Sequence, residues 1–486
     1  MSIQRQLLIG GEETPAASGR TTTDIDPYTG DVVATVAAAG PGDAARAVDA
    51  AAATFPQWSA TAPPERRRIL WKAADILESR AAEVVALMTG ETGAVAPWGH
   101  FNVHLAAEML REAASLTTQP VGEVLTTSMP GAVSLAVREP AGVVASFAPW
   151  NAPVILGTRS IATPLAVGNT VVMKPSEHAP LSAGLFLADV LAAAGLPPGT
   201  CNVLTTAPED APKVAEALIS DPRVRRVSFT GSTRVGRSIA ELAGRHLTPA
   251  VLELGGKNSV VVLDDADLAY AVNAIAFGAY LNSGQICMSA DRVVALRPVA
   301  DELAERLAEK AAKLPSGDPR DPGTLIGPLI TAAAADRVAD LVQDAVSNGA
   351  TVLAGGGRPD RAVYPASVLW GVTPAMGIEK DEIFGPVCTV LVADSDEEAI
   401  AIANSTAYGL TAGVITEDAS RGFEVARRLR TGIVHVNDQP VGDEPQAPFG
   451  GVGDSGYGRF GGRAGVESFT DLRWVTLQQG HRPFPF

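Results

Sequence analysis

Short valine-rich runs alternate with alanine-rich runs along the chain from Gly142 onward. The former have the length of buried strands, and the latter have the length of helices. The first series has expected strands at 143–147, 170–173, 201–204 and 226–229, with expected helices at 159–167, 181–194 and 211–219 between them. A second series after Leu254 has expected strands near 259–263, 292–296, 387–392 and 433–436. This alternation predicts an α/β fold built on doubly wound parallel sheets.

The chain of 486 residues is longer than one hydrophobic core usually supports, so we expect two large lobes. Ahead of the strand series, helices are expected at 44–55 and 64–87. The stretches 121–125 and 133–137 alternate in polarity like the two strands of a hairpin. Such a hairpin leaves an open strand edge unless another segment pairs with it.

The charge balance limits the possible partners. Lysine and arginine number 38 against 54 aspartates and glutamates, and the net charge of −16 argues against nucleic acid and against an anionic membrane surface. Residues 1–11 show no signal-peptide pattern, and no window of about 18 apolar residues occurs. We therefore expect a cytoplasmic protein.

Of the three cysteines, one lies in a setting that suggests reactivity. Cys201 and Cys388 lie in valine-rich stretches and are expected to be core thiols. An odd number of cysteines without metal-ligand spacing predicts neither a disulfide framework nor a metal site. Cys287 lies in the polar turn 282–289, where backbone amides and access to substrate would favour a nucleophilic thiolate. The alternative is a cysteine that simply packs, because free cysteine is often buried.

Four further stretches lie where expected strands end, which is where ligands bind in such sheets. Two of them carry groups suited to catalysis. Asn151 stands between Pro149 and Pro153, so its amide is a directed donor that can stabilise an oxyanion; an asparagine that closes a turn is the alternative. Glu253 stands between two leucines, and an apolar pocket raises the pKa of a carboxyl until it is a usable base near neutral pH. The alternative, that Glu253 is a carboxylate in a loop or at a helix cap, remains open.

The other two stretches suggest cofactor binding. Glu177 follows Lys174 at a strand end and can accept hydrogen bonds from ribose hydroxyls and repel a 2′-phosphate, unless the two form a solvated pair. Gly231 and Gly236 flank Ser232 and let backbone amides approach a phosphate. Their spacing matches neither a nucleotide triphosphatase nor the GxGxxG of ordinary dinucleotide folds, so an ordinary glycine turn stays open.

Together with residues 381–387 and 448–451, these stretches resemble the aldehyde dehydrogenase superfamily, and the match runs from 26 to 471. The resemblance implies two doubly wound Rossmann-like domains and a small β oligomerisation element. The implied dinucleotide-binding domain comprises 1–119 and 141–253, the catalytic domain 254–462, and the oligomerisation element 120–140 with 463–486. The strand 472–477 would extend a partner subunit's sheet, which resolves the open edge of the hairpin.

The resemblance also implies a role for each matching residue. Cys287 would be the nucleophile, Glu253 the base, and Asn151 the oxyanion donor beside the backbone N–H of Cys287. The implied contacts of an NAD cofactor, with NADP as an alternative, are Trp150, Lys174, Glu177, Gly231, Ser232, Gly236, Glu382 and Phe384. The thiolate adds to an aldehyde, hydride leaves to the nicotinamide, and a water activated by the base hydrolyses the thioester to a carboxylic acid.

A narrower similarity suggests the substrate class. Residues 151–159, 437–449, 453–462 and 469–474 are similar to the salicylaldehyde, vanillin and benzaldehyde dehydrogenase branch, which implies an aromatic aldehyde. The implied substrate contacts are Leu156, Arg159, Ile286 and Met288. Arg159 would face a phenolate or ring hydroxyl, or else form a structural ion pair with Asp443 or Glu444.

Three alternatives remain open. The same machinery can act on an aliphatic or betaine-type aldehyde, a semialdehyde dehydrogenase can pass its acyl group to CoA, and a relative can bind nucleotide without turnover. Glu253 favours hydrolysis over transfer to CoA, and its presence together with Cys287 and Asn151 favours turnover. The expected partners are a small-molecule aldehyde and further copies of the chain, in a homodimer or homotetramer.

Overall fold

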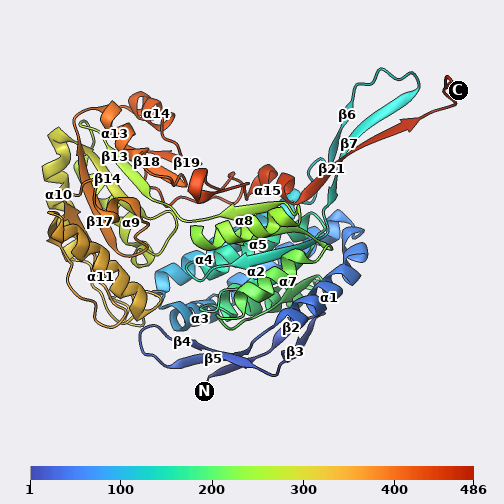
Figure 1. The fold of residues 1–486 in the computed structure, drawn as a ribbon, viewed down its shortest axis with the longest axis horizontal. Helices are drawn as coiled ribbons and strands as arrows, with labels where there is room; N and C mark the ends of the chain where they lie inside the picture. The colour runs from blue at the N-terminus through green and yellow to red at the C-terminus, as the bar shows by residue number, and fades with distance from the viewer. Residues whose placement is uncertain (1) are drawn as a thin grey trace.

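A computed structural model describes residues 2–486, and each of its two large lobes contains a mainly parallel sheet (Figure 1). The first sheet has the strand order β20-β12-β11-β8-β9-β10-β2-β3. Its parallel centre consists of β8 (Val143–Ala148), β9 (Thr170–Pro175), β10 (Cys201–Val203), β11 (Val224–Thr230) and β12 (Ala250–Glu253). The strands β2 (Leu7–Ile9), β3 (Glu12–Thr14) and β20 (Gly456–Tyr457) pair antiparallel at its edges.

Helices cover both faces of this sheet. Val144 packs on one face, whereas Val143 and Ala145 pack on the other, so β8 is apolar throughout. The helices of the first face are α2 (Pro63–Ser79), α3 (Ala81–Thr92), α4 (Ala96–Leu116), α5 (Pro153–Ala166) and α6 (Phe186–Ala194), preceded by the short η1 (Leu181–Leu185). Those of the second face are α1 (Pro41–Ser59), α7 (Ala211–Ser220) and α8 (Thr233–Arg245).

The second lobe repeats this construction around the order β15-β16-β17-β14-β13-β18-β19. Its strands are β13 (Asn258–Val262), β14 (Ala290–Leu296), β15 (Thr351–Ala354), β16 (Ser367–Trp370), β17 (Val387–Ala393), β18 (Thr411–Ile415) and β19 (Ile433–Val436). Its helices are α9 (Leu268–Tyr280), α10 (Arg297–Ala312), α11 (Ala332–Ser347), α12 (Gly377–Lys380), α13 (Asp396–Ala403) and α14 (Ala419–Ala426). Cys388 of β17 and Cys201 of β10 are buried, as expected of core thiols.

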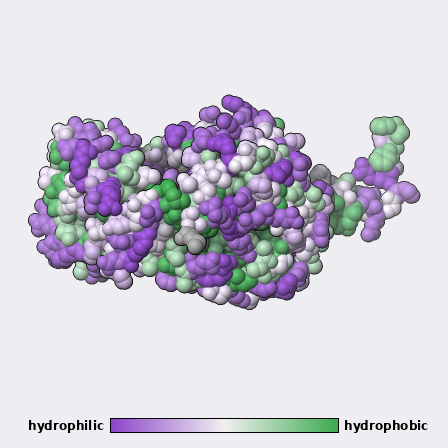
Figure 2. Space-filling view, turned by 90° about the horizontal axis from the view of Figure 1, so that it is seen from below, coloured by the Kyte–Doolittle hydropathy of each residue, from purple (hydrophilic) through white to green (hydrophobic). Residues whose placement is uncertain are grey.

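Two smaller sheets complete the molecule. The strands β1 (Ile3–Arg5), β5 (Val32–Ala37) and β4 (Thr21–Ile25) form one of them. The other, which we call the arm, consists of β6 (Gly122–Leu125), β7 (Ala132–Pro140) and β21 (Thr470–Gln478), with β21 reached from α15 (Gly462–Ser468). The arm projects from the body (Figures 1 and 2), and the C-terminus lies near its tip (Figure 1). Val124, Leu472 and Trp474 of the arm are 60% or more exposed.

The structure differs from the sequence predictions in several places. Residues 64–87 do not form one helix, because the chain leaves helical geometry at Arg80, between α2 and α3. Helix α4 was not predicted. Strand β20 belongs to the first sheet, where Gly456 pairs with Glu253, although residues 254–462 were assigned to the second lobe. The boundaries of the three predicted domains remain a prediction.

None of the helices within residues 2–486 combines the length and the apolar character that crossing a bilayer requires.

Candidate active site

Cys287 lies in a loop whose backbone is sharply bent. Helix α9 ends before it, and Asn282, Ser283 and Gly284 follow with φ angles of 49°, 56° and 70°. A Cβ on Gly284 would lie 2.1 Å from the carbonyl oxygen of Gly385, so glycine is required at this close approach. The bend thus packs the Cys287 loop against the loop that precedes β17.

Two cavities meet at Cys287. The larger is a cleft of about 670 Å³, whose wall includes Trp150, Gly231, Ser232, Glu253, Glu382 and Phe384. The smaller is a mainly apolar chamber, whose wall includes Trp98, Phe101, Leu156, Ile286, Met288 and Phe449. Cys287 and Asn151 lie in the walls of both. The thiol therefore stands where a group in the cleft and a group in the chamber would meet.

Asn151 is held from three directions. Its side-chain Nδ2 donates to the Gln285 carbonyl at 3.0 Å. Its backbone carbonyl accepts hydrogen bonds from Trp98 Nε1 at 3.0 Å and Asn282 Nδ2 at 2.9 Å. An amide nitrogen carries two hydrogens, so the contact with Gln285 uses one and sets the direction of the other. This geometry suits the oxyanion donor that the sequence suggested.

Glu253 is the last residue of β12, and it is buried. Within residues 2–486, neither of its carboxylate oxygens has a hydrogen-bond partner. Burial raises the pKa of Glu253 to about 7, against the opposing positive charge of Arg159. A carboxyl with this pKa can act as a base near neutral pH.

The Cys287 thiol does not ionise readily in this setting. Burial raises its pKa well above the usual value, and the neighbouring Glu253 carboxylate adds to the effect. The polar turn therefore does not by itself supply the thiolate that the sequence suggested. A base must take the proton, and Glu253 is close enough for its charge to be felt by the thiol.

The cofactor side of the cleft begins at the N-terminus of α8. Ser232 caps this helix, since its side chain accepts a hydrogen bond from Val235 N at 3.4 Å. A Cβ on Gly236 would lie 2.3 Å from Leu254 Cδ2, so α8 packs closely against the Leu254 side chain at this glycine. The exposed amides of a helix N-terminus suit a pyrophosphate.

Across the cleft, Trp150 and Phe384 stand edge to face with their ring centroids 5.6 Å apart. Glu382 accepts a hydrogen bond from the backbone N–H of Gly256 at 3.0 Å, and burial raises its pKa to about 8. Aromatic surface and a carboxylate side by side suit a nicotinamide and its ribose. The residues present therefore fit a dinucleotide.

Lys174 and Glu177 form an ion pair at the end of β9, and Thr206 Oγ1 donates to Glu177 at 3.0 Å. Burial alone would raise the pKa of Glu177, but the charge of Lys174 holds it below its usual value. The wall of the cleft, as formed by the described residues 2–486, does not include Lys174, Glu177 or Gly236.

Arg159 lies in the wall of the chamber and is buried. Its guanidinium forms an ion pair with Asp443 and lies 3.9 Å from the ring centroid of Phe449. The structural alternative for Arg159 is therefore present, with Asp443 as the partner.

Several residues of the chamber were not predicted. Trp98 and Phe101 come from α4, and their rings stack with centroids 5.5 Å apart. One local signal was Pro97, a residue typical of a helix start. Phe449 was noted only as part of a motif. In the part of the chain that the structure describes, no three or more histidine, cysteine or acidic side chains are grouped to hold a metal ion.

Comparison with known proteins defines the class. The aldehyde dehydrogenase family matches residues 14–475, and the chain belongs to this family. A vanillin dehydrogenase from Pseudomonas sp. strain HR199 is 53% identical over 99% of either chain. A salicylaldehyde dehydrogenase from Pseudomonas putida G7, solved in complex with salicylaldehyde, is 41% identical, with a TM-score of 0.97 over 100% of both chains. PnpE, solved in complex with nicotinamide adenine dinucleotide, is 35% identical, with a TM-score of 0.95 over 99% of each chain.

These matches confirm the predicted family, the fold class of two Rossmann-like domains with a small β element, and the prediction of an aldehyde dehydrogenase.

Proposed function

We propose that this chain oxidises an aromatic aldehyde to the carboxylic acid, with NAD⁺ as hydride acceptor. The observation that carries the proposal is the position of Cys287 between a large cleft and an apolar chamber, with Glu253 buried nearby. The flat side chains of Trp98 and Phe101 suit an aromatic ring better than a flexible chain. The vanillin and salicylaldehyde dehydrogenases among the relatives support the same substrate class.

Each catalytic group has an assigned role, and Glu253 acts twice as a base. Glu253 takes the proton from the Cys287 thiol, and the sulfur adds to the aldehyde carbon. The Asn151 amide and the backbone N–H of Cys287 stabilise the resulting oxyanion. The bound nicotinamide supplies the hydride acceptor. After Glu253 has released this proton to solvent, it deprotonates the water that attacks the thioester. The Cys287 thiolate then leaves and the carboxylic acid is released.

We assign the substrate contacts to the wall of the chamber. Leu156, Ile286 and Met288 contribute apolar surface, and Arg159 closes the wall with its charge paired to Asp443.

The first test compares aldehydes. We expect benzaldehyde, salicylaldehyde and vanillin to give higher kcat/KM than hexanal and betaine aldehyde, because the chamber is lined by rings and branched side chains. Initial rates of NADH formation measure this, and Cys287→Ala is expected to be inactive with every substrate. Higher rates with hexanal would keep the mechanism and reject the aromatic assignment. A fully inactive wild-type protein would instead favour a nucleotide-binding relative without turnover.

The second test compares cofactors. Lys174 and Glu177 are assigned to the adenosine ribose, Gly231, Ser232 and Gly236 to the pyrophosphate, and Trp150, Glu382 and Phe384 to the nicotinamide half. The Glu177 carboxylate would repel a 2′-phosphate, so we expect a higher kcat/KM with NAD⁺ than with NADP⁺. The ratio is expected to fall in Glu177→Gln, whereas the exposed Glu241→Gln on α8 serves as a control. A wild-type preference for NADP⁺ would reject this role of Glu177.

The arm supports assembly into a homodimer or homotetramer. Leu472 and Trp474 give one face of this sheet exposed apolar surface, Val124 is exposed on the other face, and the sheet ends in open edges. A partner subunit's sheet would cover this surface.

A further inference from the structure

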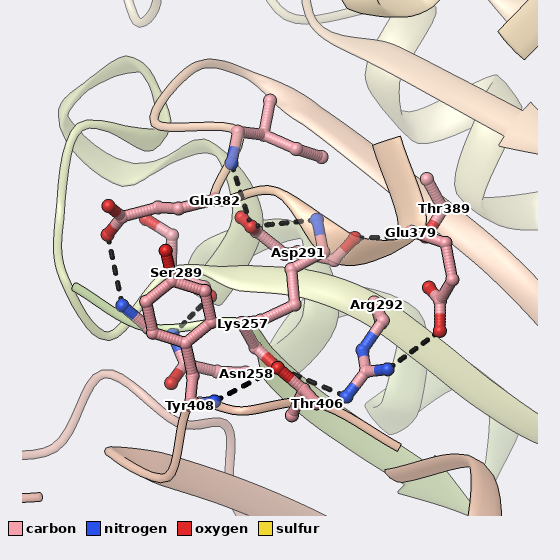
Figure 3. Close-up of polar contacts among 12 residues, drawn as sticks. Lys257, Asn258, Ser289, Asp291, Arg292, Glu379, Glu382, Thr389, Thr406 and Tyr408 are labelled. Carbon is pink, nitrogen blue, oxygen red and sulfur yellow. Dashed lines mark hydrogen bonds and ion pairs between the residues drawn. The ribbon is translucent and has the colours of Figure 1, made fainter. Parts of the chain in front are cut away.

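Asp291 joins segments that surround the active site (Figure 3). It lies in β14 and is 3% exposed. Its Oδ2 accepts a hydrogen bond from Lys257 Nζ at 3.1 Å and another from the backbone N–H of Ile383 at 3.0 Å. Lys257 belongs to the loop that follows Glu253. A single carboxylate oxygen therefore connects this loop and the strand after Cys287 with residues 381–385.

Residues 381–385 need such support, because their backbone is strained. Phe384 has a φ of 51°, a left-handed conformation that persists in a bulky residue only when its surroundings hold it. From α11, Arg337 donates to the carbonyls of Glu382 and Ile383. Asp291 holds the N–H of Ile383 from the opposite, buried side. Ile383 lies between Glu382 and Phe384, which both line the cleft.

The Cys287 segment has its own support, which carries no charge. Asn258 Nδ2 donates to the Cys287 carbonyl at 2.8 Å and to the Ser289 carbonyl at 2.9 Å. The charged pair of Lys257 and Asp291 is thus not needed to hold Cys287. A fully buried ion pair is weak evidence for stability, since apolar side chains of similar volume often serve as well. Apolar side chains cannot, however, accept the hydrogen bond that Asp291 accepts from the Ile383 N–H.

We propose that Asp291 is a positioning residue for the cofactor side of the cleft. By holding the Ile383 N–H, it keeps Glu382 and Phe384 in the orientation in which they line the cleft, while Lys257 balances its charge. This inference rests on the proposed function, because it takes these two residues to contact the cofactor.

Two double variants isolate the contact. Lys257→Met/Asp291→Asn removes both charges but keeps a side-chain oxygen for the Ile383 N–H. Lys257→Met/Asp291→Leu removes both charges and the acceptor at similar volume. We expect the asparagine variant to bind NAD⁺ like the wild type, and the leucine variant to bind about tenfold more weakly, the loss typical of one strong hydrogen bond. Tryptophan fluorescence gives the dissociation constant, and the KM for NAD⁺ should rise by the same factor.

Alkylation of Cys287 by iodoacetamide without cofactor is the control for general damage. It is expected to proceed at the same rate in both double variants, because Asn258 still holds the Cys287 segment. Equal NAD⁺ affinity of the two double variants would overturn the proposal.

A second test uses the wild-type protein alone and therefore does not depend on whether the variants fold. In hydrogen–deuterium exchange followed by mass spectrometry, the Ile383 amide is expected to be protected without NAD⁺. Exchange at the rate of an open loop would overturn the proposal. Wild-type protein that oxidises no aldehyde would overturn the proposed function instead, because exchange and alkylation are both read without turnover.

Discussion

Glu253→Gln is expected to lower kcat with vanillin by about a thousandfold, because an amide cannot take a proton from the Cys287 thiol or from water. The same base gives the wild-type enzyme its pH dependence. With a pKa of about 7, raised by burial, about a tenth of the Glu253 carboxyls are ionised near pH 6 and most near pH 8. Activity therefore rises with pH across this range, since the ionised form is the active one.

Initial rates of NADH formation across this pH range measure both effects. Glu253→Gln should lose the rise along with the rate, whereas Glu241→Gln on the outer face of α8 should keep both. A glutamine variant with substantial turnover and an unchanged pH profile would show that another group is the base.

The buried pair of Arg159 and Asp443 is expected to have a large effect on stability. Arg159→Met leaves the Asp443 carboxylate buried without its partner, which typically costs about 3–5 kcal/mol in the free energy of unfolding. Arg159→Met/Asp443→Leu removes both charges and should regain most of that loss. Denaturant unfolding measures these differences. A single variant as stable as the wild type would show that the pair contributes little.

Arg159→Met/Asp443→Leu also tests whether Arg159 contacts the ring hydroxyl of the substrate or serves only in the ion pair. Asp443 and the Phe449 ring already engage the guanidinium, so we expect the ratio of kcat/KM for salicylaldehyde and benzaldehyde to stay unchanged. A selective loss with salicylaldehyde would show instead that Arg159 contacts the ring hydroxyl.

Sequence reasoning located the strands better than the helices. The buried strands β8 and β13 have apolar side chains on both faces, so each appears in the sequence as a short run rich in valine that is easily recognised. Helix α4 went unrecognised, although it carries Trp98 and Phe101. Its polar residues His100, His104 and Glu108 recur at helical spacing on an exposed or half-buried face, so the periodic signal was present in the sequence.

By itself, the sequence determined the α/β class and the family. It also placed Asn151 and Glu253 at the ends of expected strands and Cys287 in a polar turn, because short-range patterns carry this information. Only the tertiary structure decided that Asp443, and not Glu444, pairs with Arg159. It also decided the high pKa of the Cys287 thiol and the contact of Asp291 with Ile383. These properties depend on burial and on distances between residues far apart in the chain, which packing alone establishes.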